Sequence, residues 1–250
     1  MQRLFLSVAL IGVVTLGVLS AAAAVEEPAP IKVLLIAGDD VAPYHDWREI
    51  SEKTREVLAG CGRFDVKVCE DPLILESNAA LKGYDVLVWT MFHRGTPEMT
   101  DMAKTNLVNF VKSGKGFYVQ HLGSASFPKW DEFGRLCGRK WVMGTSGHNA
   151  RSVFEAKIAK KDHPITKGMA NFRIFDELYS KLQGDTEIEV LVSAYSDFSE
   201  KEEPLVFTTP YGKGRCVHNA LGHDFKAILN PSMQQLICRS VEWAATGKVQ

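Results

Sequence analysis

The chain has 250 residues, of which 46% are hydrophobic, 10% aromatic and 24% charged. These apolar residues suffice for one sizeable core, and the composition excludes a disordered, collagen-like or coiled-coil chain. The 29 Lys and Arg residues nearly balance the 30 Asp and Glu residues, the formal net charge is −1, and no basic run stands out. Because proteins that bind nucleic-acid phosphates carry a basic surface, we expect no nucleic-acid partner.

The first 24 residues are typical of a secretory signal peptide. Arg3 precedes an apolar stretch over residues 4–19, and a run of four alanines ends at Ala24. Small residues at both positions that signal peptidase reads predict cleavage after Ala24, with residues 25–30 as a flexible leader. The alternative is an uncleaved membrane anchor, since about 20 apolar residues span a bilayer. We expect an exported protein, periplasmic or secreted, without membrane contact after cleavage.

The first half of the remaining chain alternates strands with helices. Continuous apolar runs predict strands that are buried on both faces, while caps and glycine stops predict the helices between them. The expected strands cover residues 31–37, 64–68, 84–91 and 116–121, and the expected helices cover residues 46–59, 97–113 and 129–136. This alternation indicates βαβ units and a parallel sheet.

Beyond residue 150 the pattern becomes rich in strands. The expected strands cover residues 152–159, 172–179, 187–194, 204–209 and 215–221, followed by one helix over residues 230–245. The predicted fold class is therefore α/β, with a doubly wound, mostly parallel sheet flanked by helices and a β-rich second half. We expect residues 31–247 to form a single domain.

Five cysteines follow the signal peptide, at positions 61, 69, 137, 216 and 238. None belongs to a CxxC pair, so neither a zinc ribbon nor a thioredoxin-type redox centre is supported. Most lie among apolar residues and are expected to be buried. One disulfide is compatible with the sequence, which does not assign its partners.

Histidines follow several of the predicted strands. His45, His93 and His121 each come after an apolar strand, at the carboxyl edge of the parallel sheet, where open α/β folds bind ligands. His223 follows a later strand, and His163 precedes a proline in an extended segment that suits a loop over a site. The alternative for each is an ordinary hydrogen-bonded histidine.

A carboxylate and a phenol accompany these histidines. On a strand Glu177 and Tyr179 point to the same face, so they can act side by side, although a solvated pair at a strand end is the alternative. Imidazoles with a carboxylate indicate a site for a divalent metal such as zinc. The candidate metal ligands are His45, His121, His163 and His223, with Glu177 as an additional candidate. The alternative is a metal-free site in which the same groups hydrogen-bond and carry protons.

Familiar catalytic motifs are missing from the sequence. It contains no G-x-S-x-G elbow, no G-x-G-x-x-G after the first strand, no Walker A loop and no H-E-x-x-H. Serine-hydrolase chemistry and the use of dinucleotides or nucleoside triphosphates are therefore unsupported.

Seven short motifs occur in a characteristic order: YHDW at 44–47, GKGF at 114–117, DHPIT at 162–166, DELY at 176–179, GKGR at 212–215, LGHD at 221–224 and EWA at 242–244. In this order the chain resembles the ThuA-like, or trehalose-utilisation, family over essentially all of residues 25–250. The resemblance implies a fold similar to class I glutamine amidotransferases. Residues 119–123 look like the nucleophile elbow of those enzymes with His121 in place of the cysteine, so a cysteine-dependent glutaminase is not expected.

The resemblance also implies a role in the breakdown of disaccharides, including sugars in the 3-keto form. We therefore expect a small carbohydrate ligand and a hydrolase, lyase or isomerase. The expected catalytic residues are His121, His223, Glu177 and Tyr179, and the expected substrate-binding residues are His45, Asp46, His93 and His163. The alternative is a non-catalytic sugar-binding protein that uses aromatic platforms, for which the candidates are Trp47, Trp89, Phe92, Trp130 and Trp141.

Overall fold

A computed structural model describes residues 29–38, 45–94 and 97–250 of the chain. The expected signal peptide and most of the leader lie outside the described residues. The nine strands described form one sheet in the order β2-β1-β3-β4-β9-β8-β7-β5-β6. Among the helices in this part of the chain, none is long and apolar enough to cross a bilayer.

The strands are β1 Ile31–Ile36, β2 Phe64–Cys69, β3 Val86–Trp89, β4 Gly116–Gln120, β5 Ser152–Ile158, β6 Phe172–Asp176, β7 Glu189–Ser196, β8 Lys201–Tyr211 and β9 Gly214–Asn219. The helices are α1 Trp47–Gly60, α2 Asn78–Leu81, α3 Asp101–Lys112, α4 Asp131–Cys137, α5 Phe225–Ile228 and α6 Pro231–Thr246, with 3-10 helices η1 Pro72–Glu76 and η2 His121–Ala125.

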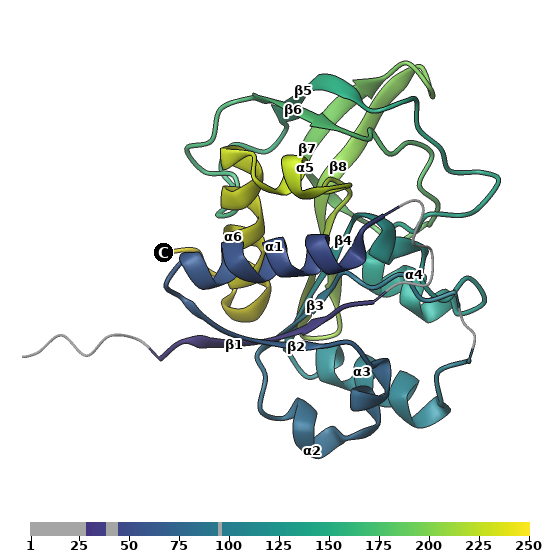
Figure 1. The fold of residues 1–250 in the computed structure, drawn as a ribbon, viewed down its shortest axis with the longest axis vertical. Helices are drawn as coiled ribbons and strands as arrows, with labels where there is room; N and C mark the ends of the chain where they lie inside the picture. The colour runs from purple at the N-terminus through teal and green to yellow at the C-terminus, as the bar shows by residue number, and fades with distance from the viewer. Residues whose placement is uncertain (1–28, 39–44, 95–96) are drawn as a thin grey trace, which may run out of the picture.

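The parallel half of the sheet lies between two layers of helices. β2, β1, β3, β4 and β9 pair in parallel. Side chains alternate between the two faces of a strand, so Leu35 and Val88 pack with α1, α5 and α6, while Leu34 and Trp89 pack with α2, α3 and α4. Figure 1 shows α1 and α6 on one side of these strands and α2 and α3 on the other. The α/β class predicted from the apolar runs is confirmed.

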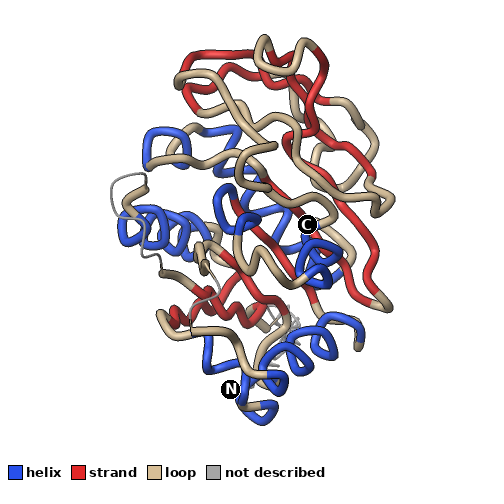
Figure 2. Tube along the Cα trace, turned by 90° about the vertical axis from the view of Figure 1, so that its right-hand side faces the viewer, coloured by secondary structure: helices blue, strands red, loops and turns tan. Residues whose placement is uncertain are grey.

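The other half of the sheet is antiparallel, so the expectation of a mostly parallel sheet was wrong. β9, β8, β7, β5 and β6 pair antiparallel, which makes four of the eight strand pairings antiparallel. Two of these pairs follow from short connections: residues 197–200 join β7 to β8, and a hairpin turn at Gly212, whose φ is +61°, joins β8 to β9. Such a turn can link only antiparallel neighbours, because a parallel pair needs a crossover of about a dozen residues. In Figure 2 these strands and their loops form the upper end of the molecule.

Side-chain caps fix the helix boundaries. Asp46 accepts a hydrogen bond from the backbone N–H of Glu49 and starts α1, as predicted. Asn230 caps α6 in the same way. The helix expected from residue 97 begins at Asp101 instead, because the side chain of Thr100 accepts from the N–H of Ala103 and forms the cap there.

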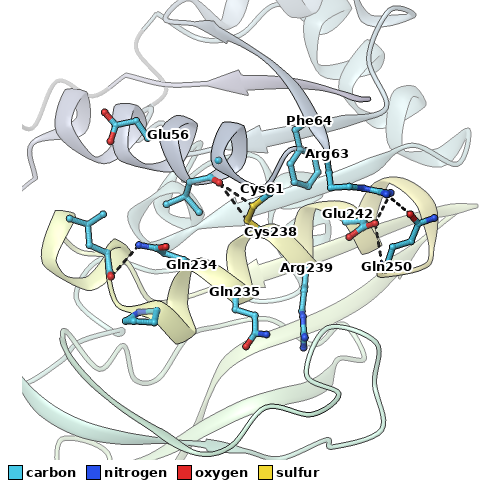
Figure 3. A pocket seen from close by; sticks show the side chains of 14 residues that line it. Glu56, Cys61, Arg63, Phe64, Gln234, Gln235, Cys238, Arg239, Glu242 and Gln250 are labelled. Carbon is cyan, nitrogen blue, oxygen red and sulfur yellow. Dashed lines mark hydrogen bonds and ion pairs between the residues drawn. A yellow bond between two sulfur atoms is a disulfide. The ribbon is translucent and has the colours of Figure 1, made fainter. Parts of the chain in front are cut away.

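A disulfide joins α1 to α6. Cys61 follows the last residue of α1, and its Cα lies 6.6 Å from the Cα of Cys238 in α6, within the usual range for a disulfide. Figure 3 shows the bond between the two helices. Cys69, Cys137 and Cys216 are free. Only Cys137 and Cys216 are buried, so the expectation that most of the cysteines are buried was wrong.

Candidate functional site

Four polar side chains meet at the edge of the sheet where the parallel strands end. His121 directly follows β4, and His223 lies in the turn after β9. His45 precedes the N-cap of α1, and Glu177 directly follows β6. Because β4 and β9 are parallel neighbours, their carboxyl ends bring the first two imidazoles together, as the sequence predicts.

The backbone turns sharply at His121. This residue has a φ of +48°, in the left-handed region that non-glycine residues rarely adopt. The turn is tight: a Cβ at Gly123 would lie 2.9 Å from the backbone oxygen of Trp89. The imidazole of His121 is held by its Nδ1, which lies 2.8 Å from the backbone oxygen of Ala220. A carbonyl oxygen can only accept, so Nδ1 carries the proton and Nε2 is the basic nitrogen.

The carboxylate of Asp176 joins the segments that carry Glu177 and His223. Asp176 is buried and accepts hydrogen bonds from the backbone N–H groups of Glu177, Gly222 and His223, at 2.8, 2.7 and 3.1 Å. Since this side chain takes the N–H of Glu177, β6 ends at Asp176, earlier than the strand expected over residues 172–179. Asp176 therefore positions two members of the site.

The four side chains each direct one atom toward a common point. The candidate ligand atoms of His45, His121, Glu177 and His223 all lie within 4.8 Å of one another. Oε2 of Glu177 is 3.4 Å from Nε2 of His121 and 3.0 Å from Nδ1 of His223. Two ligands that share a tetrahedral ion with bonds of about 2.0 Å lie about 3.3 Å apart. The two distances from Oε2 of Glu177 match this spacing.

The facing nitrogen atoms are buried without hydrogen bonds. Both ring nitrogens of His45, Nε2 of His121 and Nδ1 of His223 are buried and, among the described residues, have no hydrogen-bond partner. Buried polar atoms normally have one. At Nε2 of His121 a lone pair faces a carboxylate oxygen. A cation bound between these side chains would satisfy Nε2 of His121, Nδ1 of His223 and one ring nitrogen of His45, so the donor set fits a divalent transition metal.

The charge states of the group favour such an ion. Burial, together with the neighbouring His121 and His223, lowers the pKa of His45 to about 3, which leaves a neutral imidazole at neutral pH. Burial opposes ionisation of Glu177, but the adjacent imidazoles of His121 and His223 outweigh it and hold its pKa well below the usual range. Neutral imidazole and ionised carboxylate are the forms that bind metals.

A cavity of about 930 Å³ opens from this group. His45, Glu177 and His223 line it, so an ion held between them would lie at its wall. Tyr179 also lines it, stacked on His121 with ring centroids 4.0 Å apart. Burial raises the pKa of the Tyr179 phenol well above its usual value, so this group stays protonated and can donate a hydrogen bond.

Three of the predicted site residues lie outside both the metal-ligand group and the cavity lining, and their places correct the expected ligand and substrate-binding sets. His163 packs on Trp243 of α6, at 4.9 Å between ring centroids, and does not lie with the other three imidazoles. The reason is local: its Nδ1 accepts the N–H of Ile165, which turns the loop onto α6 rather than over the cavity. His93 packs against Phe127 and is not among the residues lining the cavity. Asp46 is exposed and caps α1.

Two residues of the site were not predicted. His148 lines the cavity with Nε2 at 3.4 Å from Oε2 of Glu177, while its Nδ1 lies 2.7 Å from the backbone oxygen of Asn149. It lies in an irregular loop, where strand periodicity gives no signal. Asp176 stands in the DELY motif, but nothing in the sequence indicates its three backbone partners. Of the expected aromatic platforms, Phe92 and Trp141 line the cavity, whereas Trp89 is buried in the core.

A second cavity, of about 550 Å³, lies beside the disulfide (Figure 3). It is lined by the end of α1 and by α6, and its Arg63 and Glu242 form an ion pair at 2.9 Å. α1 has 14 residues and is about 20 Å long. The cavity lies at its C-terminal end and His45 precedes its N-terminal end, so the two are separated by the length of the helix. The other charged side chains of this cavity also have partners: Glu56 pairs with Lys53, and Arg239 donates to backbone oxygens of Ile165 and Lys167. This cavity therefore has no reactive centre comparable to the histidine group.

The fold and the site define an α/β protein with a candidate metal centre at the carboxyl ends of its parallel strands. The chain matches the ThuA family, described as trehalose utilisation, over residues 32–244. It therefore belongs to the ThuA family, as its motif order predicts.

Solved structures agree with this assignment. A ThuA-like protein from Parabacteroides merdae is 28% identical, with a TM-score of 0.77 over 89% of this chain and 92% of that one. A ThuA-like protein from Bacteroides uniformis is 17% identical, with a TM-score of 0.69 over 89% and 96% of the two chains. A cytoplasmic protein from Salmonella typhimurium LT2 shares the fold at 14% identity, with a TM-score of 0.65 over 86% and 100%. Among curated proteins no significant sequence match was found.

Proposed function

We propose that this ThuA family member is a metal-dependent carbohydrate-active enzyme. Its substrate is a glycoside or disaccharide, including one oxidised to the 3-keto form, and its reaction is a hydrolysis, an elimination or an isomerisation. The observation that carries the proposal is the group of four ligand atoms within 4.8 Å of one another at the wall of a large cavity, of which the three imidazole nitrogens are buried and, among the described residues, without hydrogen bonds. The carbohydrate class comes from the family description.

The metal and the residues around it have separate tasks. A bound divalent ion supplies a Lewis acid that polarises a carbonyl or glycosidic oxygen. The imidazoles of His45, His121 and His223 and the carboxylate of Glu177 hold it. The protonated phenol of Tyr179 donates a hydrogen bond to a substrate oxygen beside it.

Proton transfer falls to a group outside the ligand set. His148 lines the same cavity, its side chain is 29% exposed, and its Nδ1 is anchored on the backbone of Asn149. Its Nε2 is therefore directed toward the reaction space next to Glu177. Cysteine chemistry has no counterpart here, because His121 stands at the elbow and Cys137 and Cys216 are buried.

A second candidate function is non-catalytic sugar binding in the same cavity. The observation in its favour is the pair formed by Trp141 and Tyr179, whose ring centroids lie 4.4 Å apart at the cavity wall. Aromatic faces of this kind bind the apolar face of a sugar without any reaction. A binding protein has no need of four convergent metal-ligand atoms, which is why we favour the enzyme.

We further propose that the protein is exported. The sequence of residues 1–24 supports this, and so does the disulfide between Cys61 and Cys238, because such bonds persist in oxidising compartments such as the bacterial periplasm.

The catalytic proposal is tested by incubating the purified protein with a panel of alkyl glycosides, aryl glycosides and disaccharides, together with their 3-keto derivatives, and analysing the products. We expect turnover by the parent and a loss of at least about a hundredfold in His121→Ala and His223→Ala, since each removes a metal ligand. His163→Gln is the matched control, because His163 packs on Trp243 outside the ligand group. Binding of sugars without conversion by the parent would contradict the catalytic proposal and favour the binding protein.

A further inference from the structure

The cavity beside the metal-ligand group has two chemically different ends. The polar end contains His45, His148, Glu177, Tyr179 and His223. Most of the remaining lining is apolar, namely Phe92, Leu122, Ala125, Trp141, Val142 and Met143, and Arg94, Pro128 and Lys140 complete it. Phe92, Leu122, Ala125 and Trp141 also pack against one another in a small cluster separate from the two main cores. We call these six residues the apolar wall.

The apolar wall is held in place by backbone hydrogen bonds. Lys140 forms an antiparallel bridge with Gln183, and Gly147 forms another with Ser180. Between these bridges, the side chain of Ser146 accepts the N–H of Val142 at 3.0 Å. The segment that carries Trp141, Val142 and Met143 is therefore fastened at both ends and across its middle. All three of these residues line the cavity.

Size and chemistry together indicate what occupies this wall. The cavity, about 930 Å³, is at the upper end of the roughly 300–1,000 Å³ of pockets that enclose drug-sized ligands, so a single sugar ring leaves it partly empty. On the apolar wall, a second sugar ring would bury hydroxyl groups against aliphatic and phenyl side chains that cannot hydrogen-bond. Nζ of Lys140, elsewhere in the lining, already donates to the backbone oxygen of Pro128 at 3.2 Å. Trp141 Nε1, the one indole donor of the wall, already donates to Sδ of Met143 at 3.3 Å. Unpaired buried hydroxyls are costly, so the wall disfavours a second sugar.

We propose that the apolar wall is the binding site for a flat, apolar aglycone, and hence that the ligands of this protein are aryl glycosides. The inference rests on the proposed function in one respect, that the sugar occupies the polar end. The aromatic ring then lies against Trp141 and Met143, where it buries apolar surface and can stack on the indole. Met143 is 62% exposed and Trp141 is partly exposed, so both have free surface to offer.

Calorimetric titration with matched glycosides tests this proposal. Phenyl and methyl glucopyranosides and galactopyranosides, in both anomeric forms, are compared with trehalose as a two-sugar ligand. We expect the phenyl glycoside to bind at least about tenfold more tightly than its methyl counterpart and more tightly than trehalose. Trp141→Ala and Met143→Ser should reduce this preference, and Trp141→Phe should retain it. Tyr195→Ala is the control, because Tyr195 is 52% exposed and is not among the residues lining the cavity.

The outcomes separate this inference from the proposed catalysis. Met143→Ser changes an exposed side chain, so it remains informative even if Trp141→Ala fails to fold. A tighter phenyl glycoside with no conversion of any sugar would support the aryl-glycoside site and contradict the enzyme. Equal affinities for phenyl and methyl glycosides, a preference for trehalose, no binding of any glycoside, or a preference that survives both Trp141→Ala and Met143→Ser would each overturn the inference.

Discussion

Nδ1 of His121 donates a hydrogen bond to the backbone oxygen of Ala220 at 2.8 Å, which links the turn after β4 to the turn after β9. The bond fixes the tautomer, because a carbonyl oxygen cannot donate. Nε2 therefore carries no proton, and its lone pair faces Oε2 of Glu177, which lies 3.4 Å away. Histidine ligands of metals are commonly oriented in this way, by a hydrogen bond from the nitrogen that does not bind the ion.

Asp176→Asn should weaken the site without touching a ligand. The two carboxylate oxygens accept hydrogen bonds from the N–H groups of Gly222 and His223. In asparagine an NH₂ group replaces one of these oxygens, and because NH₂ only donates, at least one of the bonds is lost. We expect a loss of about 1–3 kcal/mol in the free energy of unfolding, measured by chemical denaturation. We also expect roughly ten- to hundredfold weaker binding of Zn²⁺ or Mn²⁺ by calorimetry.

Asp162→Asn is the matched control for this prediction, because the Asp162 side chain is 83% exposed. Unchanged metal affinity in Asp176→Asn would show that these backbone bonds do not position Glu177 and His223.

His218 should make the protein less stable in mild acid. Burial lowers the pKa of His218 to about 3, against about 6.5 for an ordinary histidine. Between these pH values the unfolded chain binds a proton that the folded chain does not, so the free energy of unfolding rises with pH across this window. For each pH unit below 6.5, protonation of His218 in the unfolded chain increases the equilibrium constant of unfolding by a factor that approaches about ten.

Denaturation curves of the parent and His218→Asn between pH 7 and pH 5 measure this effect. An asparagine amide does not titrate, and its NH₂ group can replace Nδ1, which lies 3.2 Å from the backbone oxygen of Cys137. The parent should lose stability more steeply on acidification than the variant. Parallel curves would mean that His218 is not the source of the pH dependence.

The disulfide should contribute substantially to stability. Cys61 and Cys238 are separated by 177 positions, so the bond restricts a long loop in the unfolded chain. We expect Cys61→Ser and Cys238→Ser, or reduction of the parent, to lower the free energy of unfolding by about 2–4 kcal/mol. Cys69→Ser is the control, since that thiol is free. Identical denaturation midpoints with and without reductant would argue that the pair is not bonded in the protein.

The sequence predicts the parallel half of the fold well because its signals are local. The apolar run of β1, the cap at Asp46 and the cap at Asn230 each act within a few residues of the element they define. The antiparallel half was harder to predict. Its strands show similar alternation of apolar and polar residues, so the pattern does not tell which strands pair or in which direction they run. The turn at Gly212 joins β8 to β9, but no local signal sets the pairing direction of the whole sheet.

The sequence predicts those site residues whose positions are set by the strand topology alone. Parallel neighbouring strands must bring His121 and His223 to the same edge, and the sequence places both at strand ends. Loop residues do not obey this rule. His163 was expected over the site but lies against Trp243, whereas His148, in an irregular loop, lies at the cavity. Their positions depend on long-range loop packing that no sequence period encodes.

The metal content of the purified protein tests the central claim most directly. The protein is prepared without chelators, analysed by mass spectrometry of the elements, and titrated with Zn²⁺, Mn²⁺ and Fe²⁺. We expect about one equivalent of a divalent transition metal in the parent and in His163→Gln, and less than about a tenth of an equivalent in His121→Ala and His223→Ala. A parent protein that carries no such metal and binds none on titration, or a His163→Gln variant that loses it as completely as His121→Ala, would contradict a metal centre at His45, His121, Glu177 and His223.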